Sequence, residues 1–154
     1  FRSVTQKDQG YSVGAWNLGA SKASGDIIIQ LSDDWECPPG WDEMIEKRLD
    51  ISKPQVLRIS DGYRKDELLC MAILTCKYFQ ENGLFNPRFR NVYSDTDFTF
   101  RAAKNGAIVD ARDIAIVHHH PFFEERPLDA TYQRGNDPAE YERAKGIFEE
   151  LHPK

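Results

Sequence analysis

Two aspartates directly follow the most apolar stretch of this 154-residue chain. The run Ile27–Leu31 is short and almost wholly apolar, as in a buried strand, and Asp33 and Asp34 come just after it. Ligands of open α/β sheets bind at the carboxyl ends of strands, and a hard divalent cation would relieve the repulsion between two carboxylates there. Such a cation could also hold a diphosphate. The alternative is a solvated turn, which the acidic pair taken alone favours.

A second acidic group, Ser94-Asp95-Thr96-Asp97, begins a helical pattern. Ser94 and Asp97 have the spacing of a capping box, and acids in a first turn suit the helix dipole. The functional alternative makes one of these acids a general base that removes the proton of a sugar hydroxyl.

A histidine run, His118-His119-His120, ends the apolar stretch Ile114–Val117. Period-two alternation places His118 and His120 on one face and His119 on the other. If this strand ends near Asp34, His118 and His120 are candidate metal ligands. A structural or solvent-facing role is the competing interpretation.

The elements that must position these groups alternate between helix and strand. Helices are expected over 12–23, 41–49, 75–82, 94–105 and 139–151, the first with Ser12 as N-cap, and strands over 26–31, 55–59, 67–74, 107–109 and 114–118. Residues 84–93 and 124–138 are expected to form loops. The alternation predicts one α/β domain with a mixed, mostly parallel sheet flanked by helices.

Composition narrows the class of protein. Hydrophobic residues make up 40% and charged residues 29%, the net charge is −5, and basic residues are scattered along the chain. These values favour a globular protein and disfavour a nucleic-acid partner. No apolar run has the roughly 20 residues of a membrane helix, and no secretory leader is seen, so a cytoplasmic location is expected. The three cysteines are expected to be reduced core thiols.

The order of several short motifs resembles the family-2-type glycosyltransferases of the GT-A fold. Asn17-x-Gly19, Gly25-Asp26-Ile27-Ile28 and Asp33-Asp34 with Trp41 resemble the family's central stretch. Gly83-Leu84-Phe85-Asn86, Asp95-x-Asp97-Phe98, Arg101 and Gly106 resemble its acceptor-side signature. The resemblance spans residues 11–120.

The resemblance implies transfer of a sugar, with inversion, from a nucleotide-sugar donor to a hydroxyl of a glycan or other acceptor. Asp34 matches the metal-binding acid of a D-x-D motif, and His118 matches an occasional metal-ligand histidine of the family. With His120, which strand alternation places on the face of His118, they would hold Mn²⁺ or Mg²⁺. Asp33 and Ser32 then contact the donor, and Asp97 and Trp35 the acceptor. Asp95 matches the catalytic base.

The chain departs from the family pattern in three respects. Ser32 replaces the first acid of D-x-D, and Ser94 replaces the glutamate that often precedes the base. The strand–helix unit that binds the nucleotide base in the family has no counterpart here, so we expect an incomplete GT-A fold over 1–154. Without that unit's binding energy, activity of this chain alone is in doubt.

Two alternatives remain open. A non-catalytic GT-A-like module would bind or assemble, and the sheet edge left by the missing unit would favour a homo-oligomer. A small metal-binding protein built on the histidine run is the other alternative.

Overall fold

The computed structural model describes residues 5, 11–124, 127 and 130–153. The helices are α1 (Ser12–Lys22), α2 (Trp41–Glu46), α3 (Cys76–Asn82), α4 (Ser94–Lys104), α5 (Ala130–Gly135) and α6 (Pro138–Leu151). The strands are β1 (Ile27–Ile29), β2 (Trp35–Glu36), β3 (Val56–Ser60), β4 (Ile73–Thr75), β5 (Ile108–Ala115) and β6 (Val117–His118).

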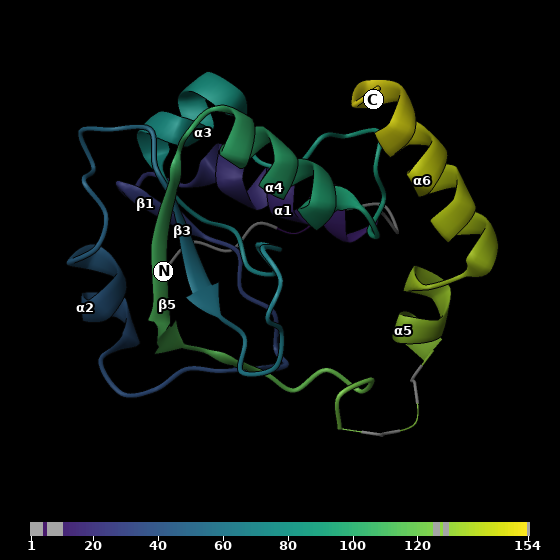
Figure 1. The fold of residues 1–154 in the computed structure, drawn as a ribbon, viewed down its shortest axis with the longest axis horizontal. Coiled ribbons are helices and arrows are strands. Elements are labelled where there is room, and N and C mark those ends of the chain that lie inside the picture. Colours follow the sequence, from purple (N-terminus) through teal and green to yellow (C-terminus); the bar gives the residue numbers. More distant parts are fainter. Residues whose placement is uncertain (1–4, 6–10, 125–126, 128–129, 154) are drawn as a thin grey trace.

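The main sheet has the strand order β1-β4-β3-β5 and is mixed, which confirms the α/β class (Figure 1). The expected mostly parallel pairing is not found: β4 is antiparallel to both β1 and β3, and β3 and β5 form the parallel pair. Residues 61–72, between β3 and β4, contain no helix. A parallel return usually uses a helical crossover, and without one β4 comes back antiparallel to β3.

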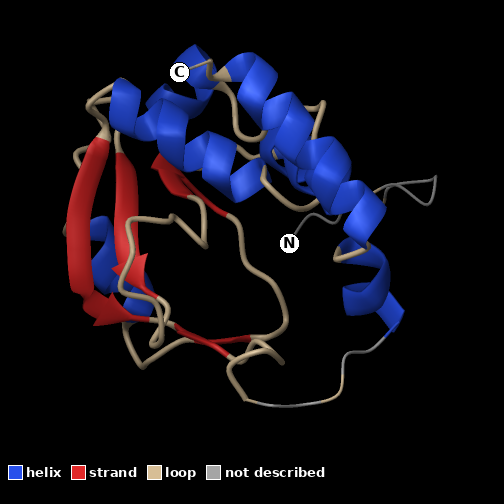
Figure 2. Ribbon diagram, turned by 45° about the vertical axis from the view of Figure 1, so that its right-hand side comes forward, coloured by secondary structure: helices blue, strands red, loops and turns tan. Residues whose placement is uncertain are grey.

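Alternate side chains of the strands enter two separate cores. Ile28, Val56 and Leu74 pack with residues of α1, α3 and α4. Leu57 and Ile73, the chain neighbours of two of these residues, point to the other face and pack with α2. The result is three layers, with α2 on one side of the sheet and the larger helical layer on the other (Figures 1 and 2).

Several element boundaries differ from the sequence expectation. The two strands expected over 107–109 and 114–118 are one strand, β5, followed by the short β6 that pairs with β2. The strand expected over 67–74 is reduced to β4. The expected loop at 124–138 contains α5. Neighbouring segments decide these boundaries, because a strand ends where its pairing partner ends.

The two serine N-caps expected from the sequence are wrong. Tyr11 and Tyr93 precede the first turns of α1 and α4, and neither side chain caps its helix. The hydroxyls of Ser12 and Ser94 instead donate to Asn91, at 2.7 Å to its Oδ1 and 2.5 Å to its carbonyl oxygen. Asn91 therefore ties the beginnings of both helices to one loop.

Among the described helices, none combines the length and the apolar character that crossing a bilayer requires.

Candidate functional site

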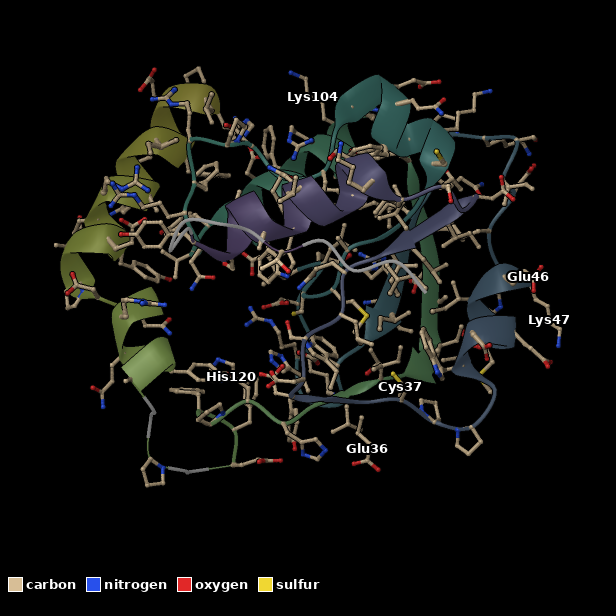
Figure 3. All side chains as sticks on the ribbon, turned by 180° about the vertical axis from the view of Figure 1, so that it is seen from behind. Glu36, Cys37, Glu46, Lys47, Lys104 and His120 are labelled. Carbon is tan, nitrogen blue, oxygen red and sulfur yellow. The ribbon has the colours of Figure 1, made fainter. Side chains whose placement is uncertain are left out.

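A cleft of about 320 Å³ lies between the end of β1 and the beginnings of α1 and α4. Its lining includes Ser12, Trp16, Ser32, Asp33, Asp34, Asn91, Asp95, His120, Tyr132 and Asn136. Figure 3 labels His120 on the side of the molecule that carries α5, whereas Glu46, the last residue of α2, and Lys47 lie at the opposite side. The cleft therefore brings together side chains from separate segments of the chain, from Ser12 to Asn136.

Asp34 lies in the turn between β1 and β2. Its carbonyl oxygen accepts a hydrogen bond from the His119 N–H at 2.8 Å, which fixes the turn against β6. The carboxylate Oδ2 accepts from the Tyr132 hydroxyl and lies 3.1 Å from His118 Nε2. Oδ1 is buried and has no hydrogen-bond partner among the described residues. A buried carboxylate oxygen without a partner is unfavourable, and a cation would satisfy it.

His118 is placed beside Asp34 by the pairing of β2 with β6, in which Trp35 and His118 are opposite each other. The indole of Trp35 stacks on the His118 ring at a centroid distance of 4.2 Å. Trp35 thereby supports the ring of His118. It does not line the cleft, although the sequence predicted that it contacts the acceptor. Coordination by His118 Nε2 would require exchange of its hydrogen bond to Asp34 for a metal bond.

His120 lines the cleft, and burial lowers its pKa, with a further contribution from His118, so that the ring is neutral at pH 7. Its Nδ1 accepts a hydrogen bond from the Phe122 N–H at 3.1 Å. The neutral tautomer that accepts at Nδ1 carries its proton on Nε2. His120 in this form presents a hydrogen-bond donor, which suits a phosphate oxygen better than the metal predicted from the sequence. His119 lies apart from this pair and contacts Glu36 and Glu124, as strand alternation predicts.

Asp95 lies in the first turn of α4 and lines the cleft. Tyr93, the residue before the helix, has a left-handed backbone with φ of 65° and redirects the chain into α4. Protein encloses most of the Asp95 carboxyl group, and this burial raises its pKa. The Thr96 N–H, which donates to Oδ1 at 2.8 Å, partly offsets the rise. A carboxylate with a raised pKa accepts a proton more readily than a free one.

Asp97, two residues further along α4, faces the protein interior. It is 1% exposed, and its two carboxylate oxygens lie 2.8 Å from Arg101 Nε and 2.9 Å from His152 Nε2. Arg101 also donates to the carbonyl oxygens of Asn82 and Leu84. Asp97 thus anchors α4 to α6 and to the loop after α3, and the structure does not bring it to the cleft as an acceptor residue.

The remaining predicted donor residues, Ser32 and Asp33, both line the cleft next to Asp34. The Asn17 side chain holds the backbone of Phe85 through two hydrogen bonds, of 2.8 Å and 3.0 Å, and the Phe85 ring contacts Trp16. Two motifs on which the family resemblance depends, Asn17-x-Gly19 and Gly83-Leu84-Phe85-Asn86, therefore meet in one wall of the cleft.

Tyr132 is the site residue that the sequence did not predict. It belongs to α5, in a segment read as a polar loop, and its hydroxyl bonds the carboxylate of Asp34. A single tyrosine in a polar stretch gives no signal of such a contact. Cys70 also lines the cleft, but burial strongly raises its pKa, so it remains a neutral thiol. All three cysteines are free and half-buried, outside the fully buried core.

Within the described part of the chain, no three His, Cys, Asp or Glu side chains are grouped closely enough to hold a metal ion by themselves. Magnesium in nucleotide sites typically uses one or two carboxylates together with phosphate oxygens and water. The Asp34 carboxylate with its unpartnered Oδ1 fits that kind of site, in which the substrate completes the coordination shell.

Comparison of the chain with models of known protein families, with curated proteins and with solved structures finds no match in any of the three.

Proposed function

We propose that this chain carries the metal edge and catalytic base of an inverting glycosyltransferase that uses a nucleotide-sugar donor. The observation that carries the proposal is that Asp34 and Asp95, 61 residues apart, line one cleft with different environments. Asp34 keeps a buried oxygen without a partner among the described residues, which suits a cation. Asp95 has a raised pKa, which suits a base.

The chemistry requires one proton transfer and one displacement. Asp95 accepts the proton of the acceptor hydroxyl while that oxygen attacks the anomeric carbon of the donor sugar. The new C–O bond forms as the bond between the sugar and the nucleoside diphosphate breaks on the opposite face, which inverts the anomeric configuration. The proton remains on Asp95 until solvent removes it, and the bonding electrons leave with the diphosphate.

A divalent cation at Asp34 would neutralise charge that develops on the diphosphate leaving group. Asp34 would hold the cation, and His120, which lines the same cleft, would donate its Nε2–H to a phosphate oxygen. Ser32, which lines the cleft beside them, would contact a phosphate oxygen.

Thermal unfolding tests the proposal without requiring turnover. We expect Mn²⁺ to raise Tm by about 2 °C or more, and a nucleoside diphosphate to raise it further only when Mn²⁺ is present. Asp34→Asn should remove both effects. Glu43→Gln is the matched control, because it removes one exposed carboxylate of α2, outside the cleft. Equal Mn²⁺ stabilisation in wild type and Asp34→Asn would overturn the proposal.

A second function, assembly without catalysis, is favoured by the edge of the sheet. Among the described residues, β1 pairs with β4 and with no strand on its other side. An apolar hollow of about 270 Å³ lies between β1 and α1, next to this open edge. Unpaired strand edges recruit further strands. If neither Mn²⁺ nor nucleotide stabilises the protein and sedimentation shows a dimer, a second copy of this chain paired through β1 becomes the better account.

A further inference from the structure

A second hollow, of about 340 Å³, lies where the loop before α4 meets the junction of α5 and α6. We call it the arginine pocket, and its charged and aromatic lining consists of Tyr11, Arg90, Arg134, Asp137, Glu140 and Arg143. Basic residues are scattered in the sequence of this acidic protein, but the fold collects three guanidinium groups from separate segments here.

The two carboxylates of the arginine pocket are already engaged. Asp137 caps α6, its Oδ1 accepting from the N–H groups of Ala139 at 2.8 Å and Glu140 at 3.3 Å. Glu140 is 9% exposed and accepts two hydrogen bonds from Arg143, at 2.6 Å and 2.8 Å. The Arg143 interaction holds the pKa of Glu140 below its ordinary value, so Glu140 stays ionised and keeps Arg143 in place.

The other two arginines keep unused donors. Arg90 reaches Glu140 with one nitrogen at 3.4 Å, and its guanidinium lies over the Tyr11 ring at 4.8 Å, which orients the planar group. Arg134 is exposed, and no hydrogen bond or ion pair joins its side chain to another residue in the part of the chain that the structure describes. Such arginine donors suit an oxyanion, which they bind with two parallel hydrogen bonds.

The arginine pocket and the cleft share a wall. Tyr11, Arg90 and Asp137 line the arginine pocket, and the next or preceding residue of each lines the cleft. The wall is held by the Ser12 hydroxyl bond to Asn91 and by the Val13 N–H, which donates to the Arg90 carbonyl oxygen at 3.2 Å. One elongated ligand can therefore place one end in the cleft and the other in the arginine pocket.

We propose that the arginine pocket binds an anionic group, a phosphate or carboxylate, on the acceptor substrate. This inference rests on the proposed function, which places the donor diphosphate at Asp33 and Asp34. The arginine pocket adjoins the cleft through the wall formed by Ser12, Asn91 and Asn136, and neither Asp33 nor Asp34 lines it. An anion bound there orients the acceptor so that its hydroxyl approaches Asp95.

Titration with inorganic phosphate, followed by NMR without divalent metal, tests the pocket directly. We expect saturable shifts of the side-chain Nε–H signals of Arg90, Arg134 and Arg143. Arg134→Gln should weaken phosphate binding about tenfold or more, because a charge-assisted bidentate contact is lost. Folding should survive, since Arg134 is exposed. Arg134→Lys should retain part of the affinity through its charge.

Arg48→Gln is the matched control, because Arg48 is an exposed arginine paired with Asp113 and lies outside both hollows. Phosphate binding that falls equally in Arg48→Gln and Arg134→Gln would overturn the site, as would shifts confined to residues 32–34.

Competition separates an acceptor anion from the donor diphosphate. A nucleoside diphosphate with Mg²⁺ should leave phosphate bound at the three arginines, and displacement of that phosphate would overturn the assignment to the acceptor. Failure of the proposed function is distinguishable from both results: the Mn²⁺ response at Asp34 would be absent while metal-free phosphate binding at the arginines persisted.

Discussion

At the scale of single residues, Asp95 and Asp97 differ in what surrounds them although they share one helical turn. Asp97 is enclosed with two partners, the guanidinium of Arg101 and the ring of His152, that satisfy both of its oxygens. Asp95 is enclosed at the cleft wall, and its carboxylate accepts hydrogen bonds from the N–H and the hydroxyl of Thr96. The first arrangement stabilises the fold, whereas the second leaves a carboxylate with a raised pKa facing a cleft.

Replacement by asparagine should have opposite effects on thermal stability at Asp95 and at Asp97. Because the pKa of Asp95 is higher in the folded protein than in the unfolded chain, its ionised form opposes folding at pH 7. Asp95→Asn should therefore raise Tm at pH 7, with the gain lost as pH falls below the ordinary pKa of aspartate. Asp97→Asn should lower stability by about 3 kcal/mol or more, because a buried ion pair loses one partner. Thermal unfolding at several pH values measures both.

Assays of sugar transfer should separate the role of Asp95 as the base from the role of Asp34 as the metal ligand. Asp95→Asn should abolish transfer while Mn²⁺ stabilisation at Asp34 persists, and the wild-type rate should rise with pH through the raised pKa of Asp95. A normal rate in Asp95→Asn would exclude Asp95 as the base.

At the scale of elements, α6 is held to the body by an apolar face and by one buried acid. Ala144 is fully buried in the larger core, with Ile147, Phe148 and Leu151 packed against it. Glu140 joins Arg143 of the same helix to Arg90 of the loop before α4.

Glu140→Gln should loosen this end of α6. We expect a loss of about 1–3 kcal/mol at pH 7, since charged hydrogen bonds are replaced by neutral ones. The pKa of Glu140 is lowered in the folded protein, so its contribution is present above the ordinary glutamate value and lost as pH falls below it. Amide hydrogen exchange of α6 measures the effect, and Glu142→Gln, on the exposed side of α6, is the control. Equal exchange in both variants would contradict this role.

The short helix α5 contacts the site through Tyr132. Its hydroxyl occupies one lone pair of Asp34 Oδ2, the oxygen that also faces His118. Tyr132→Phe should therefore make Asp34 a better cation ligand and tighten Mn²⁺ binding by up to about tenfold, the value of one hydrogen bond. Isothermal titration compares the variant with wild type. Weaker Mn²⁺ binding would show instead that Tyr132 helps to hold Asp34 in its binding position.

At the scale of the whole molecule, the apolar strand, the long helices and the two acidic groups were predictable from local pattern. Ile27–Ile29, Ser94–Lys104 and Pro138–Leu151 form where the apolar run and the helical periodicity indicate. The mixed sheet also follows from alternating elements, but its antiparallel pairs do not, because strand direction depends on the path of residues 61–72.

The features of the site that the sequence does not predict depend on contacts between residues far apart in the chain. Nothing local distinguishes Asp95 from Asp97, because only the packing of α6 brings His152 to the second of them. Tyr132 meets Asp34 across 98 residues, and the arginine pocket draws on three separate segments. The predicted roles of the site residues come from the resemblance to glycosyltransferases. In the structure Asp34, Asp95 and His120 line the cleft, whereas Asp97 and Trp35 do not.

The most direct test of the central claim, that Asp34 and Asp95 share one metal-edged site, is Mn²⁺ paramagnetic broadening measured by NMR. Bound Mn²⁺ should broaden the amide signals of residues 32–34, 94–96 and 120, while those of α2 (Trp41–Glu46) remain sharp. Asp34→Asn should abolish the broadening. Broadening that spares residues 94–96, or that affects α2 as strongly as the cleft, would contradict a shared site.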